Sequence, residues 1–464
     1  MRGGEGAAVD PLQHALASSS SSSGARDEGL AAEGGGEGAG TDPQRLSLDA
    51  AAAHTDAEAG FAVITLDEAE RLARANHPAL KRARAELAGA EAGVVAARAP
   101  LLPQLRGNAS WQYQDRPGVQ IGSSFVRSGG HSFAVGVYLD QQITDFGRTT
   151  NRLRAAGALE DAQEASVQDV EAMVLANVRQ AFFLAQAQKA FLAVSRRTLE
   201  NQQRHLDQVS AFVELGERAP YDLAQARTNV GAARSQLASA EGNYRIARAG
   251  LIQAMGISRS SEIEVADQSL PRVEGEDAPI DALLAEALEA RPDIVALDQR
   301  IRAQAFTVRS NVGGYWPILA ASGNVSGVGP GFHDLDGPAW IAGISLSWPL
   351  FQGGATLAAV NQAEASLAAL ESDREALAQQ VRYELEQSLA AIRTAVAARE
   401  AADETLTSAH EQVRLATGRY ETGLGSLLEL ADAELALQQA EAARVQADYD
   451  LSAARALLIE RLGR

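Results

Sequence analysis

The sequence predicts a mainly α-helical protein with a small β component, built from two copies of one helix–strand–strand–long helix–helix unit. Three observations predict this fold: alanine dominates the 464 residues, similar segments recur at fixed offsets, and two long stretches contain no proline. Hydrophobic residues make up 46% of the chain but aromatic residues only 5%. This composition favours long helices over the core of a compact enzyme.

The sequence contains two copies of one unit, because matched residues recur at fixed offsets. Two prolines of the first copy have counterparts 214 residues later, and three glycines have counterparts 207 residues later. The offset falls by seven only between Pro103 and Gly147, so we expect a surface loop there, where length changes are tolerated. The matched pairs are Pro78 and Pro292, Pro103 and Pro317, Gly147 and Gly354, Gly216 and Gly423, and Gly256 and Gly463.

Three segments are expected along the chain. Residues 1–60 are polar and rich in Gly and Ser, show no signal peptide, and are expected to be disordered. Residues 61–270 are expected to form the first repeat. Residues 271–464 are expected to form the second repeat.

Each repeat is expected to contain three helices. A first helix over about 66–99 begins at the capping box Thr65–Glu68, and its counterpart covers about 281–310. A long proline-free helix follows the strands, and a shorter helix returns beside it after a glycine turn. In the second long helix, hydrophobic residues recur at about the 3.5-residue spacing of helices that coil around neighbours. The long and returning helices are expected at about 148–214 and 221–255, and at about 355–421 and 427–462.

Two strands per repeat are expected between the first helix and the long helix. In residues 104–113, polar side chains alternate with apolar, aromatic or small residues. Phe133, Val135 and Val137 share one face of the next strand. Loops rich in Gly, Pro and Ser are expected between the strands, over 116–130 and 327–338. The strands are expected at about 104–114, 132–143, 318–326 and 339–349.

These strands have the length of about 9–11 residues that crosses a bilayer when tilted. Trp111, Trp340 and Trp348 lie near strand ends, where a membrane interface favours aromatic side chains. A single alternating strand would better fit a small soluble sheet, but four at repeat-related positions beside such long helices favour a membrane. Four strands cannot close a barrel, which needs about eight, so the chain is expected to assemble with copies of itself.

Several classes of function lack support in the sequence. A net charge of −19 argues against nucleic acid as a partner. The absence of cysteine excludes disulfides and thiolate metal sites, and the seven scattered histidines show no metal-binding spacing. The run His333–Asp336 is interpreted as an exposed turn rather than a cation site. No apolar run reaches about 18 residues, so we expect no transmembrane helix. Because the residue patterns offer no metal-binding or catalytic constellation, we also expect no metal, no cofactor and no catalytic residue.

Four segments of residues 62–464 together resemble the TolC-like outer-membrane efflux protein family. They are ITLDEAERLARANHPAL, PLLPQL, LFQGGA and RYETGLGSLLELADAE, in that order along the duplicated chain. The resemblance implies a homotrimer with a 12-stranded transmembrane β-barrel in the lipid of the outer membrane, continuous with a long α-helical barrel in the periplasm. It also implies a periplasmic adaptor (membrane fusion) protein and an inner-membrane transporter of the RND or ABC type as partners.

The resemblance places the family's periplasmic constriction at Glu429 and Asp432. These carboxylates are three residues apart, so they share one helix face and would form rings of like charge in a trimer. Rings of this kind suit cation binding and gating, whereas two solvated carboxylates on an acidic helix are the alternative interpretation. The resemblance also places contacts with the adaptor at the hairpin tips, at Gly216, Gly423 and Leu424.

A latch between neighbouring hairpins is also implied by the resemblance. Its matching positions in this chain are Asp222 and Tyr420, and we expect a hydrogen bond between them. The family has an arginine two residues after the turn glycine, where this chain has Gly425. Arg218 and Arg419 are the candidates to replace that arginine.

The expected function is a passive exit duct of a tripartite efflux or type I secretion system, gated at the periplasmic helical tip. Small molecules or secreted proteins would be its cargo, which the partner transporter selects. A helical-hairpin adaptor is one alternative, but it would carry one hairpin between lipoyl-like strand halves, not two duplicated units. An enzyme is the other alternative, and no catalytic constellation supports it.

Overall fold

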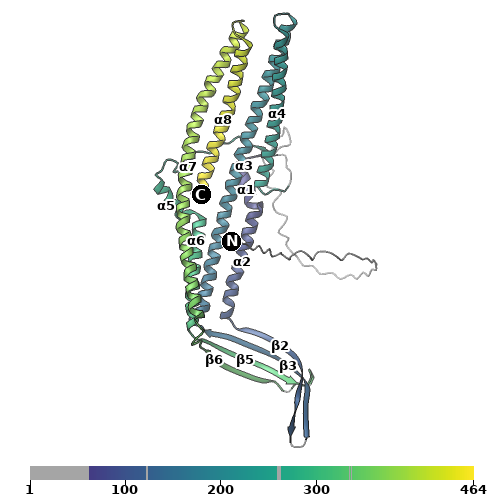
Figure 1. Cartoon of the computed structure of the whole chain (residues 1–464), viewed down its shortest axis with the longest axis vertical. Coiled ribbons are helices and arrows are strands. Elements are labelled where there is room, and N and C mark those ends of the chain that lie inside the picture. Colours follow the sequence, from purple (N-terminus) through teal and green to yellow (C-terminus); the bar gives the residue numbers. More distant parts are fainter. Residues whose placement is uncertain (1–61, 122–123, 259–262, 334, 336) are drawn as a thin grey trace, which may run out of the picture. The chain divides into compact units, whose positions relative to one another are not determined.

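The computed structural model describes residues 62–121, 124–258, 263–333, 335 and 337–464. All of them lie in one compact unit of the chain. The expected disorder of residues 1–60 and part of the run His333–Asp336 lie outside the described residues. Most of the described chain is helical, with a smaller β component (Figure 1), as the sequence predicts.

Two long helices dominate the structure. Helices α3 (Arg148–Glu214) and α7 (Ala355–Glu421) each contain 67 residues, which corresponds to about 100 Å. Each turns back into a shorter helix, α4 (Pro220–Ala254) or α8 (Leu427–Arg461), and so forms a hairpin. Within the part of the chain that the structure describes, no helix is both long and apolar enough to cross a membrane.

The first helix of each repeat is split in two, so the expected single helices over 66–99 and 281–310 are wrong. Helix α1 (Leu66–Asn76) is followed by α2 (Pro78–Arg98), and α5 (Ile280–Ala290) by α6 (Pro292–Val312). Each proline occupies the first position of the new helix, which forces the preceding residue into an extended conformation. The Thr65 side chain caps α1 and accepts a hydrogen bond from the Glu68 amide at 3.3 Å.

Four antiparallel strands form one sheet in the order β2–β3–β5–β6. The expected loop over 116–130 is wrong, because the first two strands continue through it and pair Arg116 with Ser128 and Gln120 with Phe125. The sequence run Pro117-Gly118 coincides with a register shift, where a strand tolerates a residue without an N–H donor. The strands are β2 (Gln104–Ile121), β3 (Ser124–Thr144), β5 (Ile318–Gly329) and β6 (Ala339–Ser347).

The sheet exposes apolar side chains instead of covering them. Every residue of β6 is exposed, and Trp340 has 76% of its surface accessible. Within the described residues, β2 and β6 each pair with a strand on one side only. A second sheet, which the sequence did not predict, pairs β1 (Ala62–Ile64) in parallel with β4 (Ile263–Val265). Three residues are too few to show the alternation that reveals a strand.

Among the described residues, the helices bury two large hydrophobic cores, one for each repeat, and a smaller cluster around Tyr420 near the turn between α7 and α8. Their members occupy matching positions: Val178, Phe182 and Leu251 in the first core correspond to Leu385, Leu389 and Leu458 in the second, 207 residues later. The cores fix the order of the helices. Helix α3 packs against α4, α6 and α8, and α7 packs against α6 and α8. In the hairpin region the order is therefore α4–α3–α8–α7, with α4 and α7 on the flanks.

Candidate functional site

The two hairpin turns are built alike, and both contain glycine in the left-handed conformation. Gly216 has φ +78° and Gly423 has φ +73°, values that favour glycine over residues with a Cβ atom. The Glu217 amide donates to the Phe212 carbonyl and the Leu424 amide to the Arg419 carbonyl, both at 2.9 Å. These hydrogen bonds close each long helix, and the next helix begins within six residues of its end.

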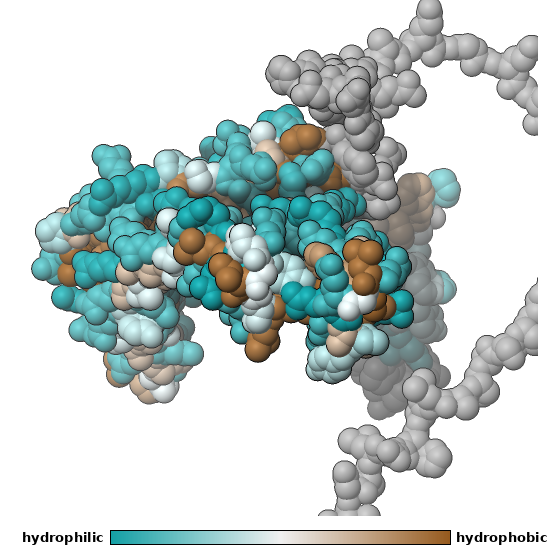
Figure 2. Space-filling view, turned by 90° about the horizontal axis from the view of Figure 1, so that it is seen from above, coloured by the Kyte–Doolittle hydropathy of each residue, from teal (hydrophilic) through white to brown (hydrophobic). Residues whose placement is uncertain are grey.

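Apolar side chains are exposed at both turns. Leu424, where the family resemblance implies a contact at the hairpin tip, is 78% exposed. Three further apolar residues at the turns are equally open, although the sequence pattern did not single them out: Leu215, Tyr221 and Leu428. Figure 2 views the chain from the hairpin end and shows separate hydrophobic areas on a mainly hydrophilic surface. Exposed apolar groups of this kind mark surfaces that contact other molecules.

The two candidate constriction residues lie at the start of α8. Ser426 caps this helix and accepts a hydrogen bond from the Glu429 amide at 3.1 Å. The Glu429 carboxylate forms an ion pair with the Arg419 guanidinium at 3.0 Å. Because the two side chains are 43% and 58% exposed, this pair contributes little to stability. Asp432 lies one turn further along α8 and is exposed.

The two candidate latch residues do not meet within one chain. Tyr420 is only 8% exposed, and its buried hydroxyl has no hydrogen-bond partner among the described residues. Its ring instead contacts the other hairpin, where the Arg218 guanidinium lies 5.2 Å from the ring centroid. Asp222 occupies the first turn of α4. The expected Tyr420–Asp222 hydrogen bond is therefore absent from the single chain, and Arg218 is the residue that reaches Tyr420.

His205 completes this contact between the hairpins. It lies on α3, is buried, and its ring centroid is 5.9 Å from that of Tyr420. Burial lowers the pKa of His205 below its ordinary value of 6.5, and the positive charge of Arg218 lowers it further. The role of His205 could not be predicted from the sequence, because an isolated histidine on a helix gives no signal of what it packs against.

Gly425 stands where the family has an arginine, and the structure gives a reason for glycine. A Cβ atom at this position would lie 3.0 Å from the Arg419 Cβ and 3.1 Å from the Arg419 carbonyl carbon. The Gly425 amide also donates to the Arg419 carbonyl at 2.8 Å. The close approach of these two backbone segments therefore leaves little room for a side chain.

Two polar contacts that the sequence did not reveal join α3 to α8. The Gln202 side chain donates to the Glu434 carboxylate at 3.0 Å, and the Arg197 guanidinium lies 3.4 Å from the Glu441 carboxylate. Burial raises the pKa of Glu434, although the Gln202 hydrogen bond and the Arg204 charge oppose that rise. Only the packing of the two hairpins brings these residues together.

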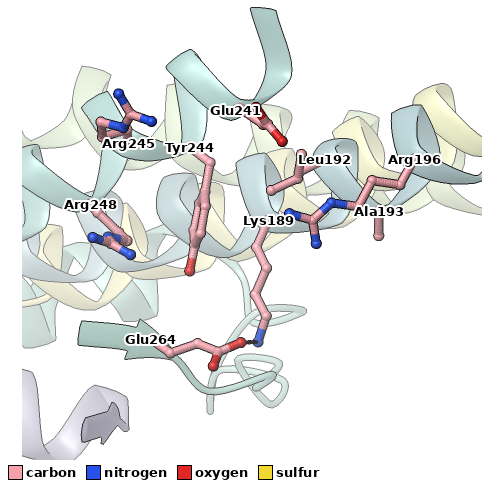
Figure 3. A pocket seen from close by; sticks show the side chains of 9 residues that line it. All are labelled: Lys189, Leu192, Ala193, Arg196, Glu241, Tyr244, Arg245, Arg248 and Glu264. Atoms are coloured by element: carbon pink, nitrogen blue, oxygen red, sulfur yellow. Dashed lines mark ion pairs between the residues drawn. The ribbon is translucent and has the colours of Figure 1, made fainter. Parts of the chain in front are cut away.

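A cavity of about 510 Å³ lies between α3, α4 and β4 (Figure 3). Its lining carries four cationic and two anionic side chains, and Lys189 is paired with Glu264 at 3.1 Å. Arg248 in this lining is the repeat counterpart of Arg455, whose guanidinium binds the Glu276 carboxylate at 3.1 Å. The Arg248 Nε atom is buried without a hydrogen-bond partner. The two repeats thus differ in charge pairing at equivalent positions. The remaining charged residues of the lining are Arg196, Arg245 and Glu241.

Comparison with known families identifies the chain. The sequence model of the outer membrane efflux protein family matches residues 70–257 and 283–464. The chain belongs to this family. It is therefore a protein of the outer membrane, and its family role is that of an efflux channel.

Relatives with similar sequences agree with this assignment, and solved structures share the fold. The pyoverdine export outer membrane protein OpmQ of Pseudomonas putida is 26% identical over 412 residues, which cover 87% of this chain and 86% of the relative. Protein CyaE of Bordetella pertussis is 27% identical over 80% of this chain and 78% of its own length. The Campylobacter jejuni CmeC outer membrane channel superposes with a TM-score of 0.76 at 20% identity, covering 86% of this chain and 85% of that one. The Neisseria gonorrhoeae MtrE channel in its open state gives 0.72 at 20% identity, covering 86% and 88%.

Proposed function

We propose that three copies of this chain form a passive exit duct from the periplasm to the exterior. Each copy would give its four strands to a 12-stranded β-barrel in the outer membrane, and the long helices would form a tunnel in the periplasm. The observation that carries this proposal is the exposed apolar sheet, whose edge strands β2 and β6 lack a partner on one side within the described residues. In lipid, unpaired strand edges are too costly to persist, so the sheet must close with other copies.

The duct would work as the outer component of a tripartite efflux or type I secretion system. A periplasmic adaptor would contact the hairpin tips at Gly216, Gly423 and Leu424, where exposed apolar side chains gather. An inner-membrane transporter of the RND or ABC type would supply the energy and select the cargo, small molecules or secreted proteins. The chain itself would contribute the two repeats, residues 61–270 and 271–464, and no chemistry.

Gating is assigned to the start of α8. In a trimer, Glu429 and Asp432 would form two rings of like charge, which repel each other and attract cations. Arg419 partly neutralises Glu429 through the 3.0 Å ion pair. Tyr420 would act with Asp222 of a neighbouring hairpin as a latch in the assembled protein, while Arg218 holds Tyr420 within each chain.

Assembly and location are tested together by fractionation and native mass spectrometry of the full chain. We expect recovery in the outer membrane and a mass of three chains. Recovery in the inner membrane or cytosol would contradict the exit duct, and a monomer in the outer-membrane fraction would contradict the closed barrel.

Gating is tested by conductance in planar bilayers. The wild-type protein should conduct poorly and be blocked by divalent cations, whereas Glu429→Ala with Asp432→Ala should raise conductance and weaken the block. Glu421→Ala is the matched control, because Glu421 is an exposed carboxylate at the same hairpin tip but lies on α7. Cation block that persists unchanged in the double variant would exclude the two rings.

A further inference from the structure

The two hairpins of one chain meet along a line of opposite charges, which we call the internal seam. It consists of Arg197 and Arg204 on α3 and of Glu434 and Glu441 on α8. Arg197 pairs with Glu441 at 3.4 Å, and the Arg204 charge acts on Glu434. On each helix the two charged residues are seven apart, so they share one face. The helices run antiparallel, with arginines on one side and carboxylates on the other.

The repeat relates each of these four positions to a counterpart 207 residues away, and every counterpart has the opposite charge. The arginines of α3 correspond to carboxylates on α7, and the carboxylates of α8 correspond to arginines on α4. The correspondences are Arg197 with Glu404, Arg204 with Glu411, Glu434 with Arg227, and Glu441 with Arg234. Because all four charges are reversed together, α7 and α4 carry charges that are complementary to each other, as α3 and α8 do, but with the negative charges on the long helix.

The counterpart residues are available for contact with another molecule. Arg227, Arg234, Glu404 and Glu411 are all exposed, and α4 and α7 flank the helix order of the chain. Over the described ranges, Arg227, Arg234 and Glu404 form no ion pair, and Glu411 pairs only with Arg414 on its own helix, at 2.6 Å. Because the equivalent positions on α3 and α8 face a neighbouring hairpin, these positions should face one as well.

We infer that α7 of one copy docks against α4 of the next copy through Glu404–Arg234 and Glu411–Arg227, which form an external seam with the charges of the internal seam reversed. The occupant of each flank is therefore a second copy of this chain. This inference rests on the proposed trimer, in which a head-to-tail contact must close into a ring. It adds the residues and the register of the contact.

The charge reversal determines which hairpins can be neighbours. Two first-repeat hairpins in contact would place Arg197 and Arg204 against Arg234 and Arg227, and two second-repeat hairpins would place carboxylates against carboxylates. Both arrangements are repulsive, so first and second repeats must alternate around the ring. Exposed ion pairs add little affinity, but such repulsion discriminates effectively between partners and registers.

Cysteine cross-linking tests the register, because the chain contains no native cysteine. Purified protein carrying Arg234→Cys and Glu404→Cys, treated with a short bismaleimide, should give covalent dimers and trimers. Arg234→Cys with Glu411→Cys is the off-register control, because the second cysteine lies about 10 Å further along α7. Arg197→Cys with Glu441→Cys should link only within the chain. Equal intermolecular linking by the in-register and off-register pairs, or none by the in-register pair, would overturn the seam.

Charge reversal tests the energetics. Arg227→Glu with Arg234→Glu should shift native mass spectra from trimer towards monomer, and adding Glu404→Arg with Glu411→Arg should restore the trimer. Glu375→Arg, at an exposed position of α7 outside the seam, should have no effect. A four-fold variant that stays monomeric would contradict the pairing, as would a trimer unaffected by the first reversal. A monomeric wild type would instead refute the proposed trimer itself.

Discussion

Tyr420 is the residue that best shows how single contacts hold the hairpin ends together. Most ion pairs near the tips are exposed and therefore weak, as Arg419–Glu429 illustrates. Tyr420 is buried and contacts two residues of the other hairpin, the Arg218 guanidinium and the His205 ring. A cation over an aromatic face contributes about 0.5–1 kcal/mol at a partly exposed site. Because this contact is weak, breaking it would let the two hairpins move apart at a small cost in free energy.

Removing Arg218 should change the titration of His205. Burial and the Arg218 charge both lower the pKa of His205, so Arg218→Ala should move that pKa upward towards 6.5 without restoring it fully. Nuclear magnetic resonance of the imidazole measures the shift. Arg152→Ala is the control, since Arg152 is exposed and lies near the other end of α3 from His205. A His205 pKa that is equal in Arg218→Ala and wild type would contradict the proximity of the two charges.

Acidification should loosen the hairpin contact. The unfolded chain protonates histidine near pH 6.5, whereas the folded chain keeps His205 neutral to lower pH. The unfolded state therefore binds more protons as the pH falls through about 6.5, and the free energy of unfolding falls with it. Hydrogen exchange of the Tyr420 region should accelerate as the pH is lowered through this window, after correction for intrinsic exchange.

Substitutions isolate the histidine in that measurement. His205→Gln should remove most of the pH dependence, because glutamine does not titrate. Glu434 titrates with the opposite sign, since burial raises its pKa and the folded state takes up its proton more readily. Both proteins are therefore compared in a Glu434→Gln background. An unchanged pH dependence in His205→Gln would assign the effect to another group.

At the scale of elements, the sequence predicts what is long and periodic. The proline-free stretches between Gly147 and Gly216, and between Gly354 and Gly423, match α3 and α7. The sequence predicts less well where local composition and pairing disagree. The Pro- and Gly-rich residues 116–130 resemble a loop, yet backbone pairing with the adjacent strand keeps them extended. Likewise, β1 and β4 exist only because each pairs with the other.

At the hairpin tips too, features set by the local sequence could be predicted, whereas contacts between distant segments could not. Gly216, Gly423 and Leu424 could be placed at the tips because turn glycines and helix ends are local signals. The contacts of Tyr420 could not be predicted, because Arg218 and His205 reach it through the packing of the two hairpins. The family resemblance pointed to Tyr420 and Asp222, which do not meet within one chain, and their contact between neighbouring hairpins stays a prediction.

Gly256 provides a test at the scale of elements. It follows α4 with φ +69°, and a Cβ atom there would lie 2.6 Å from the His77 Cα atom. Gly256→Ala should therefore lower stability by about 1–2 kcal/mol from the backbone conformation alone, and by more from the clash. Thermal unfolding measures the loss. Gly93→Ala, inside α2 with no atom within 4 Å of the new Cβ, should be neutral or stabilising. Equal stability of the two variants would contradict the close packing at His77.

At the scale of the whole molecule, the two repeats share a core but differ at the surface. Matching positions bury the same kinds of side chain, from Val178 and Leu385 to Leu251 and Leu458. The charges reverse between the internal and external seams, and Arg248 lacks the carboxylate that Arg455 binds. Duplication therefore explains the fold, while divergence of surface charge gives each flank of the chain a different neighbour.

The exposed sheet is the strongest argument that the chain assembles with other copies of itself. Its exposed apolar strands and the one-sided pairing of β2 and β6 within the described residues need partners that one chain does not supply. A closed barrel of three sheets would provide them, because β6 of one copy would pair with β2 of the next.

Electron cryo-microscopy of the full-length protein in lipid nanodiscs tests this central claim most directly. We predict a three-fold assembly in which β6 of each copy is hydrogen-bonded to β2 of its neighbour and 12 strands close around one axis. Sheets that stay open, or an assembly with another number of copies, would contradict the account.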